Sequence, residues 1–140
     1  MKVGIINGPN LNMLGVREPG VYGDLSLEEI IEQIRENFPS VEILDFQSND
    51  EGELISKVQE WGMISDAIII NPGGYSHTSV AIRDAISSIT APVIEVHISN
   101  IHSREEFRHT TITGGACRAV ISGLGKEGYS VALSHLVGSK

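Results

Sequence analysis

The sequence predicts an α/β protein of the flavodoxin-like type, a three-layer sandwich built on a five-stranded parallel sheet. Short apolar runs alternate along the chain with segments of helical periodicity, and one run, "AIIIN", is apolar throughout. Strands that alternate with helices form parallel sheets covered on both faces. A strand that is buried on both faces reads as a continuous apolar run. With right-handed crossovers between five strands, we expect the strand order 2-1-3-4-5.

Five apolar runs are expected to form the strands. Each is short, contains Val or Ile, and is bounded by turn-forming residues. The first, "VGIIN", ends in the turn "GPN", and the third, "AIIIN", ends in "NPGG". In chain order, the expected strands cover residues 3–7, 41–46, 67–71, 92–97 and 119–123.

The segments between these runs carry the apolar spacing of helices, with recognisable start signals. Ser26 with Glu29, and Ser103 with Glu106, match the capping-box pattern. Asn49 is the expected N-cap of the second helix. The expected helices cover residues 26–38, 49–61, 77–89 and 125–137, with a short turn of helix over 103–107.

The stretch "NMLGVREPGVYG", residues 12–23, interrupts this alternation. Its glycines and Pro19 disfavour both helix and strand, so we expect a loop that can move. The same stretch carries Arg17, Glu18 and Tyr22. Loops that close over a substrate often carry catalytic side chains, although a solvated Arg–Glu pair beside a packed tyrosine explains the residues equally well.

Length, charge and cysteine content limit the class of protein. The chain of 140 residues fits one domain, residues 1–140. A net charge of −8 argues against nucleic acid or an anionic membrane as a partner. The single Cys117 cannot form an intrachain disulfide and suits a reducing cytoplasm. We expect a cytoplasmic protein, because "MKVGIINGPN" lacks the apolar run of a signal peptide and no segment is long enough to span a bilayer.

Polar, glycine-rich turns follow the first, third and fourth expected strands. In open parallel sheets, ligands bind beyond the carboxyl ends of the strands, at the point where the strand order reverses. Any one of these turns is explained by the turn-forming tendency of Asn, Gly and Pro. Three such turns at one sheet edge, two with histidine, indicate a site. Its candidate residues are Asn7, Asn10, Asn12, Asn71, Gly73, Gly74, Ser76, His77, Glu95, His97, Ser99, Asn100, His102 and Arg108.

The sequence lacks the residue patterns of nucleotide-binding, metal and Schiff-base sites. The sequence has neither a P-loop nor the G-x-G-x-x-G pattern of dinucleotide-binding folds. No histidine, cysteine or carboxylate cluster has the spacing of a metal site, and no lysine falls in the three turns, which disfavours Schiff-base chemistry. We therefore expect neither a metal nor a cofactor, and a small polar substrate. An alternative is a module that binds a small anion or a flavin phosphate.

Three long motifs carry a resemblance to a known family. The stretches "IINGPNLNMLGVREPGVYG", "NPGGYSHTSVAIRDA" and "PVIEVHISNIHSREEFR" resemble the type II 3-dehydroquinate dehydratases of the shikimate pathway. The resemblance covers the chain from Val3 to about Gly128, and Gly74 and Ser76 are small departures from it. It implies a hydro-lyase that converts 3-dehydroquinate reversibly to 3-dehydroshikimate, by anti elimination through an enolate and without a covalent intermediate.

The resemblance also implies roles for individual residues. Tyr22 is the base and Arg17 stabilises its phenolate, because a nearby guanidinium favours the charged form. His97 is the general acid and Glu95 holds its imidazole. Asn10, with Asn71, either orients His97 or holds an enolate water and the substrate. The implied substrate-binding residues are Asn71, His77, Asp84, Ile98, Ser99 and Arg108.

The family likeness further implies a homo-oligomer. Its members form trimers, commonly four of them in a dodecamer. Asp84 lies seven residues beyond His77 on the same expected helix, which is roughly 10 Å along the axis. By resemblance, Asp84 therefore reaches the site of a neighbouring subunit and bonds to that subunit's copy of Arg108. The alternative is an exposed helix charge without a role.

Overall fold

The five strands form one parallel sheet with the order β2-β1-β3-β4-β5, which confirms the predicted topology. The computed structural model describes residues 1–16 and 18–140. Each pair of neighbouring strands runs parallel, and Asn7 and Asn71, the last residues of β1 and β3, face each other in register. The strands are β1 (Lys2–Asn7), β2 (Glu42–Gln47), β3 (Ala67–Asn71), β4 (Val93–His97) and β5 (Ala119–Ser122).

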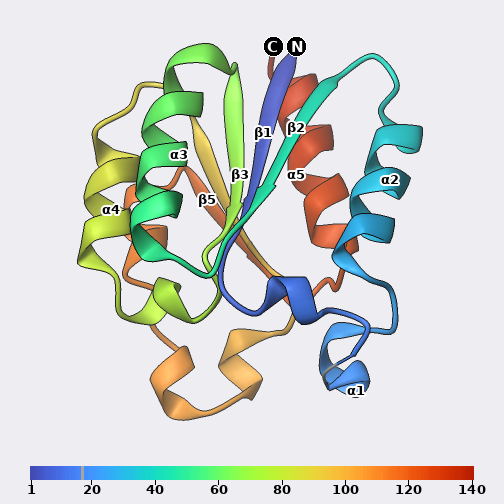
Figure 1. Cartoon of the computed structure of the whole chain (residues 1–140), viewed down its shortest axis with the longest axis vertical. Coiled ribbons are helices and arrows are strands. Elements are labelled where there is room, and N and C mark those ends of the chain that lie inside the picture. The colour runs from blue at the N-terminus through green and yellow to red at the C-terminus, as the bar shows by residue number, and fades with distance from the viewer. Residues whose placement is uncertain (17) are drawn as a thin grey trace.

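Helices cover both faces of this sheet (Figure 1). The helices α2 and α5 pack on one face, and α3 and α4 pack on the other. Among the described residues, no helix is long and apolar enough to cross a membrane. The helices are α1 (Pro19–Tyr22), α2 (Leu27–Asn37), α3 (Glu51–Ile64), α4 (Val80–Ser87) and α5 (Glu127–Gly138).

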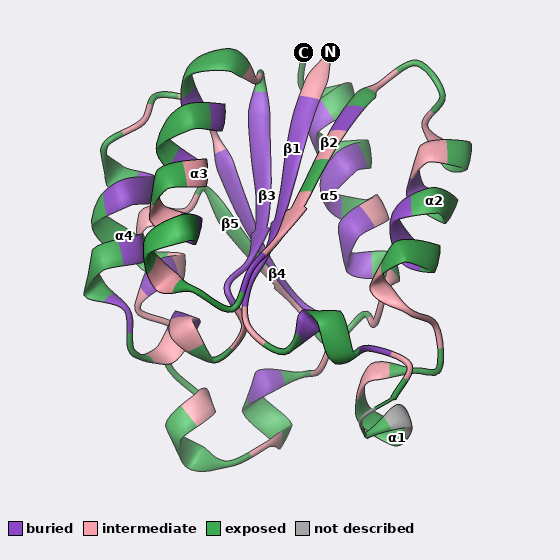
Figure 2. Ribbon diagram, viewed as in Figure 1, coloured by how far each residue is buried: buried purple, intermediate pink, exposed green. Residues whose placement is uncertain are grey.

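The central strand β3 is buried along its whole length, as its apolar run predicts (Figure 2). Ile69 belongs to the apolar cluster under α2 and α5, whereas Ile68 and Ile70 belong to the cluster under α3 and α4. Successive side chains of a strand point to opposite faces, so one strand serves both clusters. Burying each isoleucine contributes about 1.5–3 kcal/mol. These contacts hold the two helical layers on the sheet.

The predicted N-cap residue is confirmed for α2 and was wrong for α3. Ser26 Oγ accepts a hydrogen bond from the Glu29 N–H at 3.1 Å, and both bonds of the predicted capping box are present. The N-cap of α3 is Asp50, whose carboxylate accepts from the Glu53 N–H at 2.9 Å. The prediction of Asn49 was wrong because its side-chain oxygen instead accepts from the Asn10 N–H at 3.0 Å.

The helix predicted from residue 77 begins later. Ser79 caps α4 by accepting from the Ile82 N–H at 2.9 Å, and a 3₁₀ turn covers Gly73–His77. His77 therefore lies in the turn before the helix. This placement brings its ring to the carboxyl edge of the sheet, where it stacks on His97.

Two further segments differ from their predictions. The expected helix over 103–107 is replaced by 3₁₀ turns at Ile101–Ser103 and Glu106–Arg108. Its predicted capping box does not form, because Ser103 Oγ donates to the Asn100 carbonyl at 3.0 Å. Within residues 12–23, where no helix was expected, α1 makes a single turn. It ends at Tyr22 and so places this side chain beside the sheet edge.

The segments that follow the strands gather at one end of the molecule. In Figure 1, the carboxyl ends of the strands, α1 and the turns of residues 101–108 lie at the bottom, and both termini lie at the top. This is the edge at which the sequence predicts a site.

Candidate active site

A cavity of about 140 Å³ opens at the carboxyl edge of the sheet. Pockets for drug-sized ligands are typically about 300–1,000 Å³, so this cavity suits a smaller molecule. The predicted site residues that line it are Asn10, Tyr22, Asn71, Gly73, Gly74, His77, His97, Ile98, Ser99 and Arg108.

His97 and Glu95 form a buried pair at the end of β4. Both side chains lie on the same face of the strand, with Glu95 fully buried behind His97. Nε2 of His97 lies 2.8 Å from a carboxylate oxygen of Glu95. An ionised carboxylate only accepts hydrogen bonds, so Nε2 is the donor. Nδ1 is then the ring nitrogen left for a molecule in the cavity.

Two threonines hold the Glu95 carboxylate from the other side. Thr111 Oγ1 donates to one oxygen at 2.6 Å, and Thr113 Oγ1 donates to the other. Burial alone raises the pKa of Glu95, but the hydrogen bonds from His97, Thr111 and Thr113 outweigh it and hold that pKa below its ordinary value. Glu95 is therefore an ionised group that keeps the imidazole of His97 in one orientation.

Tyr22 receives a charged hydrogen bond from Arg104, a residue that is not among the predicted site residues. Arg104 Nη1 donates to the Tyr22 hydroxyl oxygen at 2.6 Å, and the guanidinium lies 5.3 Å from the centre of the tyrosine ring. The Arg104 side chain is 15% exposed and lines the cavity, so water screens this contact little. Arg104 therefore places a positive charge directly at the hydroxyl oxygen of Tyr22.

The spacing of "SREEFR" could have pointed to Arg104. Two arginines four residues apart lie on one side of a helical turn, whereas only the second, Arg108, is a predicted site residue. In the structure, both Arg104 and Arg108 line the cavity. The contact between Arg104 and Tyr22 joins residues 82 positions apart, which spacing alone does not reveal.

His77 and Arg108 offer polar groups to the same cavity. The Nδ1 atom of His77 donates to the Thr110 carbonyl at 2.8 Å, which leaves Nε2 as the acceptor of a neutral ring. Its ring stacks on His97 with 6.2 Å between centres. Arg108 Nε donates to Glu105 at 2.9 Å, and within residues 1–16 and 18–140 its terminal nitrogens remain as donors. An acceptor beside donors is an arrangement that suits hydroxyl groups.

The sequence was compared with models of known protein families. The family model described as dehydroquinase class II matches residues 1–137. The chain belongs to the class II dehydroquinases. The resemblance noted from the three sequence motifs is thereby confirmed.

Individual members of this family are similar over nearly the whole chain. A protein named 3-dehydroquinate dehydratase from Aliarcobacter butzleri is 52% identical, over 98% of this chain and 85% of that protein. One of the same name from Lachnoclostridium phytofermentans is 49% identical, over 98% of this chain and 97% of its own. The crystal structure of type II dehydroquinase from Butyrivibrio crossotus has a TM-score of 0.95 and 47% identity, covering 98% of this chain and 97% of that one.

Of the other residues expected at the site of this dehydroquinase, the described ones that do not line the cavity are Asn7, Asn12, Ser76, Asp84, Glu95, Asn100 and His102. Arg17 lies outside the described residues. Asp84 is exposed on α4 and is not among the residues that line the cavity. The expectation that Asp84 does not serve the cavity of its own subunit is compatible with this position.

Cys117 packs against the apolar cluster under α3 and α4. Burial, together with the nearby charge of Glu95, raises the pKa of its thiol to about 12. The thiol therefore stays protonated at neutral pH, which suits a packing residue rather than a nucleophile.

The lowered pKa of Glu95 predicts how stability changes in acid. A carboxyl whose pKa is depressed by folding stabilises the protein above its unfolded pKa, and this contribution is lost as the pH falls through the folded value. We expect the melting temperature to fall more steeply below about pH 4.5, the ordinary value for glutamate, in the unchanged protein than in Glu95→Gln. Thermal unfolding from pH 7 to pH 3 measures this difference, and parallel curves would contradict it.

Proposed function

We propose that this class II dehydroquinase dehydrates 3-dehydroquinate reversibly to 3-dehydroshikimate, without metal or cofactor. The observation that carries the proposal is the pairing of Tyr22 with Arg104 and of His97 with Glu95 at one cavity. One pair supplies a base and the other an acid, which are the two groups that the removal of water requires. The names of the relatives support this substrate.

In the first proposed step, the Tyr22 phenolate takes the proton from C2, beside the ketone of the substrate. The electron pair of the broken C–H bond forms a double bond between C2 and the carbonyl carbon, the π pair of the carbonyl moves onto its oxygen, and an enolate forms. Arg104 stabilises the phenolate before the transfer, and Arg17 adds a second positive charge by resemblance to the family. A tyrosine without such a charge beside it is a weak base at neutral pH.

The second proposed step expels the C1 hydroxyl as water. His97 protonates the departing oxygen from Nδ1, the C–O bond breaks, and the electron pair of the enolate forms the new double bond. Because Nε2 donates to Glu95, a ring that also donates from Nδ1 is an imidazolium. The carboxylate of Glu95 balances this charge, and the transfer returns the ring to its neutral form.

The remaining cavity residues are proposed to bind the substrate. The backbone N–H groups of Ile98 and Ser99 hold its carboxylate, and Asn10 holds a water that hydrogen-bonds the enolate. His77 and Arg108 bind the ring hydroxyls. Neutral N–H donors stabilise a developing oxyanion without the cost of desolvating a full charge. The alternative, a module that binds a small anion or a flavin phosphate, has no use for a base and an acid at the same cavity.

Turnover is the direct test of this function. The purified protein is incubated with 3-dehydroquinate, and the ultraviolet absorbance of the conjugated enone product is followed. We expect the absorbance to rise at the same rate with and without a strong chelator. Absence of any rise would overturn the proposed function, and a rate that the chelator abolishes would overturn the metal-free mechanism.

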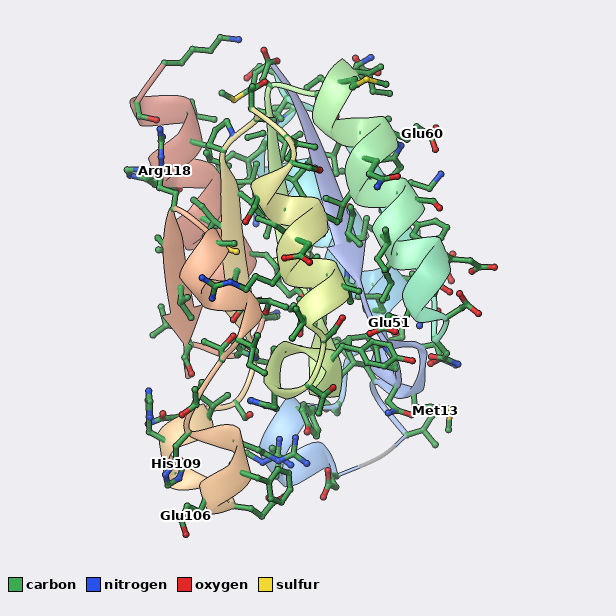
Figure 3. The ribbon with its side chains drawn as sticks, turned by 90° about the vertical axis from the view of Figure 1, so that its left-hand side faces the viewer. Met13, Glu51, Glu60, Glu106, His109 and Arg118 are labelled. Carbon is green, nitrogen blue, oxygen red and sulfur yellow. The ribbon has the colours of Figure 1, made fainter. Side chains whose placement is uncertain are left out.

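Arg104→Gln is expected to lower kcat by about 10- to 100-fold, because a hydrogen bond to a charged group contributes about 1.5–3 kcal/mol. The matched control is Arg118→Gln, which removes an exposed guanidinium far from the turn that carries Glu106 and His109 (Figure 3). Initial rates of both variants at saturating substrate measure the effect. Equal rates for the two variants would exclude Arg104 from the mechanism.

We further propose that the active enzyme is a cytoplasmic homo-oligomer of trimers, assembled as a dodecamer, in which Asp84 completes a neighbour's site. Asp84 is exposed on α4, where a second subunit can reach it. The terminal N–H groups of Arg108 are proposed to donate to the Asp84 carboxylate of the neighbouring subunit. A carboxylate on these nitrogens would orient the guanidinium toward the substrate hydroxyls.

A complementation experiment tests the shared site. Asp84→Ala and Tyr22→Phe proteins are unfolded, mixed and refolded together. If Asp84 acts across the interface, some mixed sites combine an intact Tyr22 with a neighbour's intact Asp84, and activity exceeds the average of the two parents. A mixture without gain, or a fully active Asp84→Ala protein, would show that Asp84 is not part of a shared site.

A further inference from the structure

A buried chain of polar side chains lies behind the cavity and has no part in the proposed reaction steps. It consists of Asn7 at the end of β1, Tyr129 on α5 and Asn71 at the end of β3. The exposed fractions of these residues are 1%, 0% and 4%. Asn71 lines the cavity, so these three hydrogen-bonded side chains connect the C-terminal helix α5 to the site.

The orientation of the Asn71 amide follows from a neighbour that can only donate. The backbone N–H of Gly73 lies 3.1 Å from one side-chain atom of Asn71, so that atom is the oxygen, Oδ1. The nitrogen, Nδ2, is then the atom that lies 3.2 Å from the Tyr129 hydroxyl. Gly73 has a φ of +61°, a conformation that glycine adopts without strain.

The Tyr129 hydroxyl can donate its proton to only one of its two partners, Asn7. Since Asn71 donates to the hydroxyl oxygen, Tyr129 donates its own proton to Asn7 Oδ1 at 2.6 Å. Burial raises the pKa of Tyr129, so the hydroxyl keeps its proton at neutral pH. One N–H of Asn71 is used by Tyr129 and the oxygen is used by Gly73, which leaves the second N–H as the strong donor for the cavity.

We propose that Tyr129 is a positioning residue that fixes the Asn71 amide so that the cavity presents an N–H donor to an oxygen of the substrate. This inference rests on the proposed function, in which the substrate carries a carboxylate and develops an enolate oxygen. A flipped amide would present a carbonyl oxygen to these groups and repel them. It would also separate Gly73 from its acceptor. Tyr129 and Gly73 act from opposite ends of the same amide to prevent the flip.

Tyr129→Phe is the first test, because it removes the hydroxyl and keeps the ring in the core. We expect kcat/KM for 3-dehydroquinate to fall by about tenfold. Tyr75→Phe is the matched control, since the Tyr75 hydroxyl donates to the Asn49 carbonyl at 2.8 Å and does not line the cavity. The control is expected to retain the wild-type value within about twofold.

The same substitution in an Asn71→Ala background separates positioning from general loss of structure. If Tyr129 acts through the Asn71 amide, Tyr129→Phe causes no further loss of kcat/KM once the amide is absent. A tenfold loss in both backgrounds would overturn the inference, and so would a Tyr129→Phe protein with wild-type activity. An inactive wild-type protein would instead overturn the proposed function itself, and the inference with it.

A second variant covers the case in which Tyr129→Phe does not fold. Asn7→Ala keeps the tyrosine but removes the acceptor of its proton, which frees the hydroxyl to donate toward Asn71 and favours the flipped amide. We expect a smaller loss of kcat/KM than in Tyr129→Phe, again absent in the Asn71→Ala background. A loss that persists without the Asn71 amide would count against the positioning role of Tyr129.

Discussion

Tyr22→Phe is expected to lower kcat by about 10³-fold or more, because it removes the group that takes the C2 proton and general bases contribute about 10²- to 10⁴-fold. The substitution deletes one oxygen, and the ring keeps its contact with the Arg104 guanidinium. Substrate binding should therefore persist. Steady-state turnover measures the first effect, and the rise in melting temperature on adding 3-dehydroquinate measures the second.

The control for Tyr22→Phe is the same substitution at Tyr75. Tyr75→Phe removes a hydroxyl that bonds outside the cavity, so it should turn over at close to the wild-type rate. A Tyr22→Phe protein with near-wild-type kcat would mean that another group is the base. A variant that is inactive and no longer stabilised by substrate would indicate that Tyr22 binds rather than reacts.

His97→Ala is expected to lower kcat by about 10²- to 10⁴-fold, the range for removal of a general acid. It also leaves Glu95 as a buried carboxylate without one of its three donors, so the melting temperature should fall as well. Turnover and thermal unfolding are measured on the same preparation. His135→Ala, which removes an exposed histidine on α5, is the control and should change neither.

Glu95→Gln should reduce kcat less than His97→Ala does. The amide keeps a hydrogen-bonding group next to Nε2 of His97 but removes the charge that balances the imidazolium, and orientation contributes less than the acid itself. A larger loss for Glu95→Gln than for His97→Ala would reverse the roles assigned to these two residues.

The sequence by itself determined the architecture and much of the candidate site. The apolar run of β3 and the capping box of Ser26 and Glu29 are local patterns, and both are present in the structure. The alternation of strands and helices predicts the sheet order, because few right-handed crossover topologies exist. The edge of that sheet then places His77 and His97 near each other without knowledge of any contact.

The tertiary structure alone decided which side chains serve one another. Asn49 and Asp50 are both good N-caps by residue type, and Asp50 caps α3 because the Asn10 backbone, 39 positions away, uses the Asn49 side chain. Arg104 reaches Tyr22 across 82 positions, and Tyr129 reaches Asn71 across 58. Local patterns report only neighbours along the chain, whereas these hydrogen bonds depend on how the loops and α5 fold back onto the sheet.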